Sequence, residues 1–184
     1  MRSEQQKTRL DFHDCYLPAG AFVPAYGRLM LFEQLDKLEK RVLYHDTDSI
    51  IYVYDPAEYN IPTNDIWGTW EEEKISKEGI TEFISTGPKS YAIKTRDSEI
   101  VKLKGVALKH SHRFLVNFDS MKKLIFDTLE GINPQIEIPQ YKFNYKLGKG
   151  MHNEEFYKIF KFHSTDLKGD LKEDLCVYPK GYRE

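Results

Sequence analysis

The stretch Tyr44-His45-Asp46-Thr47-Asp48-Ser49-Ile50 decides how the rest of the chain is organised. It places the carboxylates of Asp46 and Asp48 two residues apart, between apolar runs at residues 41–44 and 50–54. Two apolar runs joined by a short polar segment predict the strands of a hairpin. Paired acids at a hairpin tip suit a hard divalent cation, which prefers oxygen ligands. Asp is also common in turns, where it bonds its own backbone, and spacing alone favours that simpler interpretation.

The composition is typical of a folded protein. Hydrophobic residues make up 40% and aromatic residues 14% of the 184, which excludes a disordered chain and allows one large domain or two small ones. Cys15 and Cys176 lie far apart, which favours a reducing compartment over a disulfide scaffold. No apolar run reaches membrane-spanning length and no signal-peptide core follows the N-terminus. We therefore expect a soluble, intracellular protein without a membrane partner.

The net charge of −2 conceals two blocks of opposite sign. Residues 44–82 hold ten acids and two lysines, whereas residues 89–123 hold nine Lys or Arg residues and three acids. Two solvated faces would explain the pattern. A cation site beside a track for an anionic polymer would explain it as well.

The hydrophobic pattern predicts an α+β fold in which an antiparallel sheet packs on helices. Residues 20–40 predict a helix, with Leu31, Leu35 and Leu38 on one apolar stripe. A second stripe on this helix, which includes Phe22 and Tyr26, predicts an early half that is buried nearly all round. Further elements follow from period-two or helical spacing: strands at 66–71, 79–86, 89–94, 99–104, 136–138 and 143–145, a helix at 119–130, and a strand or short helix at 155–162.

The residues around the two acids resemble motif C of family B DNA polymerases, usually written Y-G-D-T-D-S. The context resembles the protein-primed branch found in viruses, linear plasmids and self-synthesising transposons. Four further segments carry this resemblance in the family's order: the stretch before motif C at 21–29, a Lys-x-Tyr segment at 79–92, the start of a thumb-side helix at 117–121, and the C-terminal ending at 178–182.

The resemblance implies two Mg²⁺ ions that serve nucleotidyl transfer from a dNTP to a primer end. Asp48 would be the ligand that both ions share with a motif A aspartate, and Asp46 would lie in or beside the ligand shell. Tyr44, Thr47 and Ser49 would support the motif.

The resemblance also assigns primer–template contacts to the basic block. Lys89 and Tyr91 match the Lys-x-Tyr positions that contact the primer terminus, and Lys104-Gly105 matches a site that touches primer–template phosphates. Tyr91 could instead be a core aromatic residue. Four further basic residues are candidates for backbone contacts or for a solvated surface: Lys109, Arg113, Lys122 and Lys123.

The chain also departs from the family. His45 replaces the usual glycine or aromatic residue, and motifs A and B would lie upstream of residue 1. The resemblance therefore implies an incomplete polymerase: a palm portion at 21–115 and a thumb at 116–184, with no role given to residues 1–20. Its expected partners are DNA, the N-terminal polymerase half and a terminal priming protein, and we expect no activity from this chain alone.

Two other functions stay open. The chain could be a non-catalytic nucleic-acid-binding remnant of a mobile-element or viral polymerase, or a metal-dependent phosphohydrolase that uses further His or Asp ligands. His110-x-His112 has no third ligand nearby, so zinc is not expected. Trp67 and Trp70 are expected to pack in the core.

Overall fold

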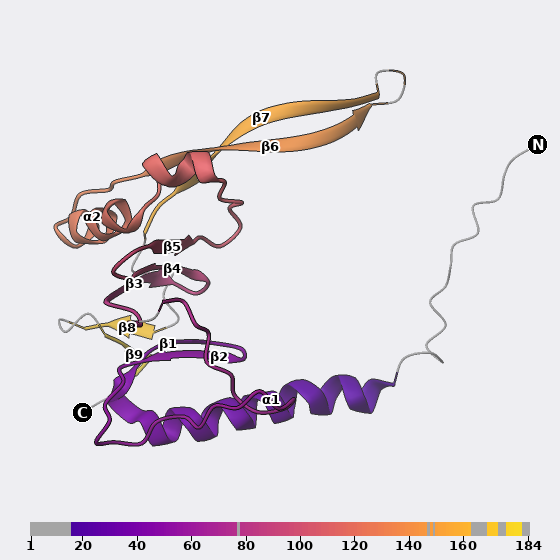
Figure 1. The fold of residues 1–184 in the computed structure, drawn as a ribbon. Coiled ribbons are helices and arrows are strands. Elements are labelled where there is room, and N and C mark those ends of the chain that lie inside the picture. Colours follow the sequence, from indigo (N-terminus) through magenta and orange to yellow (C-terminus); the bar gives the residue numbers. More distant parts are fainter. Residues whose placement is uncertain are drawn as a thin grey trace, which may run out of the picture. The chain divides into compact units, whose positions relative to one another are not determined.

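The computed structural model describes residues 16–76, 78–146, 148, 150–162, 169–172 and 176–181 (Figure 1). Residues 1–15, which include Cys15, and Tyr182 of the predicted C-terminal ending lie outside the described residues. Contacts divide the chain into two units, one up to Trp70 and one from Glu71. The palm and thumb boundaries inferred from the sequence stay predictions.

The first unit begins with helix α1 (Leu17–Leu38), and the short 3-10 helix η2 (Glu39–Arg41) follows it directly. The predicted helix is confirmed, and it starts three residues early because Pro18 fits a first turn, where its missing N–H costs nothing. Pro24 lies inside the helix, where its ring removes one backbone hydrogen bond.

The burial of α1 is concentrated in its second half. Leu31, Gln34 and Leu38 are buried, spaced three to four residues apart along one stripe. Phe22 and Tyr26, by contrast, are 73% and 66% exposed. The prediction of an early half buried nearly all round is therefore wrong.

Strands β1 (Val42–Asp46) and β2 (Ser49–Tyr52) form the predicted hairpin directly after η2. Arg41, at its base, fixes the loop that follows β2. Its Nε lies 2.7 Å from Glu58 Oε2, and its guanidinium donates to the backbone oxygen of Tyr59. The Tyr59 hydroxyl in turn donates to Gln34 Oε1 of α1 at 2.7 Å. These bonds hold helix, hairpin and loop of the first unit together.

The strand predicted at 66–71 does not form, apart from one isolated bridge between Thr63 and Trp70. Side chains compete for the backbone there. Asn64 Oδ1 accepts from the Ile66 N–H, and Thr69 Oγ1 donates to the backbone oxygen of Ile66 at 2.6 Å. Such local bonds favour turns over a sheet ladder.

The second unit is built around a three-stranded antiparallel sheet of β3 (Glu82–Gly87), β4 (Ser90–Lys94) and β5 (Glu99–Lys102). The sheet order follows the chain order because a two-residue turn at 88–89 joins the first two strands and a short loop joins the last two. All three strands were predicted from the sequence, β5 with an end two residues too late.

Helix α2 (Phe118–Leu129) follows the short 3-10 helix η3 (His110–Phe114). Asn117 caps α2, since its side chain accepts from the Ser120 N–H at 2.8 Å. The helix packs on the sheet. Its buried residues Phe118 and Met121 join the core together with four others, Ala92, Leu103, Val116 and Ile138.

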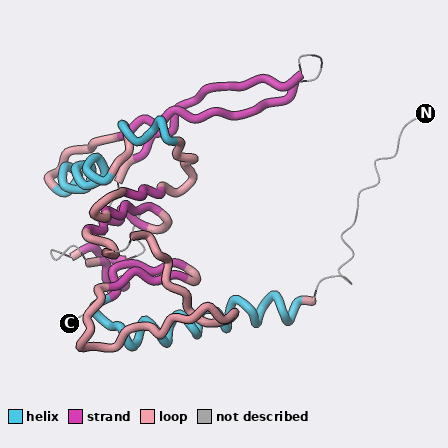
Figure 2. The backbone as a smooth tube through the Cα atoms, viewed as in Figure 1, coloured by secondary structure: helices cyan, strands magenta, loops and turns pink. Residues whose placement is uncertain are grey.

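The chain ends in two antiparallel strand pairs, β6 (Ile136–Lys146) with β7 (Gly150–Phe160) and β8 (Gly169–Leu171) with β9 (Val177–Pro179). The strands β6 and β7 run side by side over their whole length (Figure 2). The two short strands predicted at 136–145 are therefore one long strand, and the segment at 155–162 is mostly strand. The protein has an α+β fold with small antiparallel sheets. Among the described residues, no helix combines the length and the apolar content needed to cross a bilayer.

Candidate functional site

The two acids of the hairpin lie at its tip, as the sequence predicts. Asp46 is the last residue of β1 and pairs in register with Ser49, the first residue of β2, so that Thr47 and Asp48 form the connection. The Asp48 N–H donates to the Asp46 backbone oxygen at 2.5 Å, across Thr47 with φ of 45°. A bond between residues i and i+2 with positive φ at the centre describes a γ-turn, which is strained.

The polar neighbours of Asp46 hold it in place. Thr47 Oγ1 donates to Asp46 Oδ1 at 3.1 Å, and Ser49 Oγ donates to the Asp46 backbone oxygen at 3.1 Å. Tyr44 lies two residues before Asp46 in the same strand and therefore on the same face, half-buried. Asp48 is exposed at the turn. Asp46 is the oriented acid of the pair and Asp48 the accessible one.

The oxygen ligands of this tip suit Mg²⁺ in kind but are too few to surround it, because Mg²⁺ requires near-octahedral coordination. Within the part of the chain that the structure describes, no three His, Cys, Asp or Glu side chains gather as a metal site. The hairpin therefore offers two carboxylates of a site whose other ligands must come from elsewhere.

Lys89 lies in the two-residue turn between β3 and β4, with φ of 59°. Pro88 precedes it, and its ring fixes φ near −65°, so the pair fits a type II turn with Lys89 at the position that usually requires glycine. A lysine in this backbone conformation costs free energy. The turn thus presents a lysine where local stability alone would favour glycine.

Tyr91 lies two residues further on, in β4, paired in register with Lys102 of β5. Its ring is half-buried, 6.1 Å from the ring of Phe83 and 5.7 Å from Lys102 Nζ. Both interpretations of the sequence therefore describe part of it. Tyr91 packs on a neighbouring aromatic ring and also supports a lysine by a cation–π contact.

Lys104 and Gly105 form the turn that ends β5. The Val106 N–H donates to the Leu103 backbone oxygen at 3.2 Å, and Gly105 has φ of 73°. A Cβ at Gly105 would meet no atom within 4 Å, so the backbone conformation rather than space calls for glycine here. The turn ends the strand earlier than predicted.

These two turns meet. A surface hollow of about 470 Å³ is lined by Lys89, Lys104 and Gly105, together with Lys102. The structure therefore brings three of the four predicted primer–template residues to one basic hollow, with the fourth, Tyr91, beneath Lys102. The acidic hairpin belongs to the first unit and this hollow to the second.

Two lysines of this hollow were not predicted as site residues. Lys102 was recognisable because it alternates with Lys104 along the predicted strand. Lys158 of β7 donates from Nζ to the Gly105 backbone oxygen, which fixes the turn from outside. No signal in the sequence links residues 105 and 158, because the contact depends on how the β6–β7 hairpin packs.

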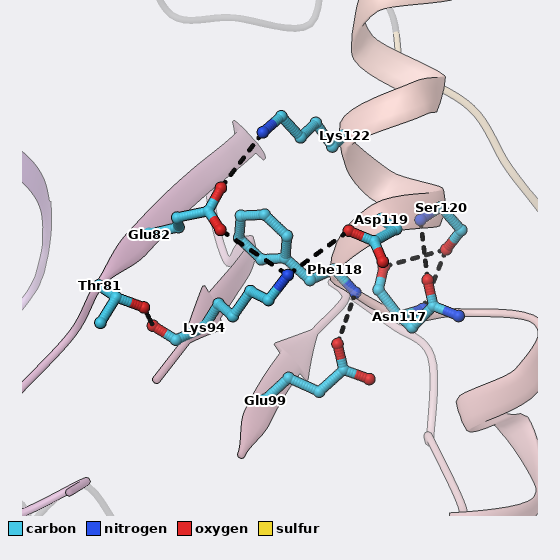
Figure 3. A network of polar contacts seen from close by, with 9 residues as sticks. All are labelled: Thr81, Glu82, Lys94, Glu99, Asn117, Phe118, Asp119, Ser120 and Lys122. Atoms are coloured by element: carbon cyan, nitrogen blue, oxygen red, sulfur yellow. Dashed lines mark hydrogen bonds and ion pairs between the residues drawn. The ribbon is translucent and has the colours of Figure 1, made fainter. Parts of the chain in front are cut away.

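The other basic residues of the block fall into two groups. Lys122 Nζ lies 3.2 Å from Glu82 Oε2, and Lys94 Nζ lies 3.7 Å from Glu82 Oε1 and 3.8 Å from Asp119 Oδ1. Figure 3 shows these ion pairs around the ring of Phe118 at the start of α2. Lys122 is therefore neutralised, which weakens its candidacy for a DNA contact.

Lys109 belongs to the second group, with Nζ 4.5 Å from the centre of the Tyr141 ring. Across the β6–β7 hairpin, the charge of Glu155 raises the pKa of the Tyr141 hydroxyl above its ordinary value of 10.0. The Lys109 N–H donates to Nδ1 of the buried His112 at 3.0 Å, which gives that histidine a structural role.

The tryptophans behave differently from each other. Trp70 is partly buried, whereas Trp67 is fully exposed at 100%. The prediction that Trp67 packs in the core is wrong, because the turns at 64–69 direct the chain away from a strand.

Comparison of the chain with protein-family models, curated proteins and solved structures finds no match. The resemblance to family B polymerases therefore stays a prediction from the sequence.

Proposed function

We propose that the chain is the C-terminal palm and thumb portion of a DNA-directed DNA polymerase of the protein-primed family B type. One observation carries the proposal. Lys89 and Lys104, which the sequence motifs assign to primer and template, lie fifteen residues apart in the chain and line the same basic hollow. The motifs were matched without knowledge of this meeting, so their convergence supports the assignment.

The acidic hairpin is the proposed half of the metal site. Asp48 is accessible for a metal, and Asp46 is oriented by the Thr47 hydroxyl. Bound Mg²⁺ would lower the pKa of the primer 3′-hydroxyl and stabilise the charge that develops on the transferred phosphoryl group. The remaining ligands would come from a motif A aspartate in the N-terminal half of the polymerase, and we propose that this half acts with the chain.

The basic hollow would hold the primer–template through its phosphates. Lysines at a protein surface attract the DNA backbone without regard to sequence, and they position it for the reaction. The incoming dNTP, the motif B lysine that binds it, and the terminal protein that primes synthesis would contribute from outside this chain.

Photo-crosslinking tests this assignment. A primer–template whose primer ends in 4-thiothymidine is irradiated with the chain and the N-terminal half. Peptides with residues 89–91 or 104–105 should carry the crosslink, identified by mass spectrometry. Crosslinks confined to other peptides, such as the one with Lys122, would contradict the assignment of the hollow.

A non-catalytic nucleic-acid-binding remnant is the second candidate. The observation that favours it is that the two carboxylates have no third His, Cys, Asp or Glu companion within the described residues. This candidate keeps DNA binding by the hollow and predicts no nucleotide incorporation, whichever N-terminal segment is supplied.

A further inference from the structure

A second hollow lies beside the first one in the second unit. Its volume is about 260 Å³, and its polar lining comes from the end of β5 and from η3: Glu99, Lys109, His110, His112 and Arg113. Val101 and Leu108 line both hollows, so the two adjoin across these apolar side chains. The first hollow opens at the Lys104 turn and the second at η3.

The charge along the two hollows is strongly positive. Together they are lined by five Lys or Arg residues and one acid. That acid, Glu99, is engaged elsewhere, because its Oε2 accepts from the Phe118 N–H at 3.1 Å at the start of α2 (Figure 3). The lining is therefore suited to an anionic ligand that spans both hollows.

The cations of the hollows differ from the neighbouring cations in their partners. Lys94 and Lys122 share the carboxylates of Glu82 and Asp119. Among the described residues, no carboxylate lies within ion-pair distance of Lys104 or Arg113. The basic block is thus divided into a neutralised part on the sheet and α2, and a part whose charge is available along the hollows.

We propose that the two hollows form one track for the backbone of a single DNA strand, in which Lys109, His110 and Arg113 make a second phosphate subsite. The inference rests on the proposed function and extends its primer–template site. From Lys102 to Glu99 the strand β5 covers about 10 Å at ~3.3 Å per residue. That length corresponds to about three nucleotides at ~3.4 Å each. The track therefore places two phosphate subsites about three nucleotides apart on one strand.

The test is the salt dependence of primer–template binding by the full chain, measured by fluorescence anisotropy. Each phosphate contact that is lost should lower the slope of log K against log salt by about 0.9. We expect this reduction for Arg113→Met and for Lys104→Met, with affinity about tenfold weaker at low salt for each. Lys122→Met is the matched control, because it removes the same charge from a lysine that Glu82 neutralises, and it should change affinity less than about twofold.

The outcomes separate this inference from the proposed function. If Lys104→Met lowers the slope while Arg113→Met behaves like Lys122→Met, the track ends at the first hollow and the inference is wrong. If the unaltered chain does not bind primer–template, the proposed function itself fails. Arg113→Lys keeps the charge and should keep the slope, which excludes misfolding as the cause of an Arg113→Met effect. Competition by free dNTP at equal phosphate concentration would overturn the inference in favour of a nucleotide site.

Discussion

The Lys104 backbone N–H donates a hydrogen bond to Ser90 Oγ at 3.0 Å. Ser90 is the first residue of β4, and only 6% of it is exposed. The bond ties the turn that carries Lys104 to the turn that carries Lys89. One buried hydroxyl therefore holds together the two halves of the proposed phosphate-binding hollow.

Removal of this hydroxyl should loosen the hollow. Ser90→Ala leaves the Lys104 N–H without its partner, which should lower the free energy of unfolding by about 1–3 kcal/mol. Urea denaturation measures this loss. The exposed Ser111 offers a control, since Ser111→Ala should be neutral within about 0.5 kcal/mol. Equal stability of the two variants would show that the bond contributes nothing.

The strained turn at Lys89 should give opposite changes in stability and in DNA affinity. Lys89→Gly relieves the positive φ, so the free energy of unfolding should stay equal or rise by up to about 1 kcal/mol, while affinity for primer–template falls. Lys89→Met loses the same charge but keeps the strain, and should weaken binding without any gain in stability. A Lys89→Gly variant that is less stable, or that binds DNA as before, would refute this account of the turn.

The cap of α2 should be worth a measurable amount. Asn117→Ala removes the acceptor for the Ser120 N–H and should lower the free energy of unfolding by about 1 kcal/mol, measured in urea. Asn117→Asp restores an acceptor and adds a favourable charge at the helix N-terminus, so it should recover most of that loss. Failure of the Asp variant to recover stability would mean that the Ala effect has another cause.

The ion pairs around Glu82 should contribute little, and only at low salt. Glu82→Gln removes the shared partner of Lys94 and Lys122, but all three side chains are more than 40% exposed. The expected loss is about 0.5 kcal/mol at low ionic strength, and it should disappear in 1 M salt, where the screening length is about 3 Å. Glu72→Gln, an exposed change of equal charge, is the control. A loss that persists in high salt would indicate packing rather than charge.

Elements that depend on local pattern were predictable from the sequence. The hairpin at 42–52 and the β3–β4 hairpin combine period-two apolar runs with turn residues inside a short window. Helix α2 shows its apolar stripe together with the Asn117 cap and a positive φ at Gly131, so both of its ends were marked.

Features that depend on distant partners were not predictable. The strand at 66–71 fails because Asn64 and Thr69 bond the local backbone, which outweighs the apolar pattern. The exposure of Phe22 reflects which elements cover α1, and no periodicity reveals that. Lys122 and Lys104 look alike in the sequence, yet only Lys122 meets a carboxylate, one that lies forty residues away.

The central claim is that the hairpin tip holds the metals of a DNA polymerase. The most direct measurement is primer extension by a protein that combines this chain with the motif A and motif B segments, in saturating Mg²⁺. Metal ligation contributes several kcal/mol of charge stabilisation, so Asp48→Ala should slow nucleotide incorporation by about 100-fold or more. The exposed Asp36 of α1 is the control, and Asp36→Ala should extend primers at the unaltered rate. Unchanged extension by Asp48→Ala would contradict the claim.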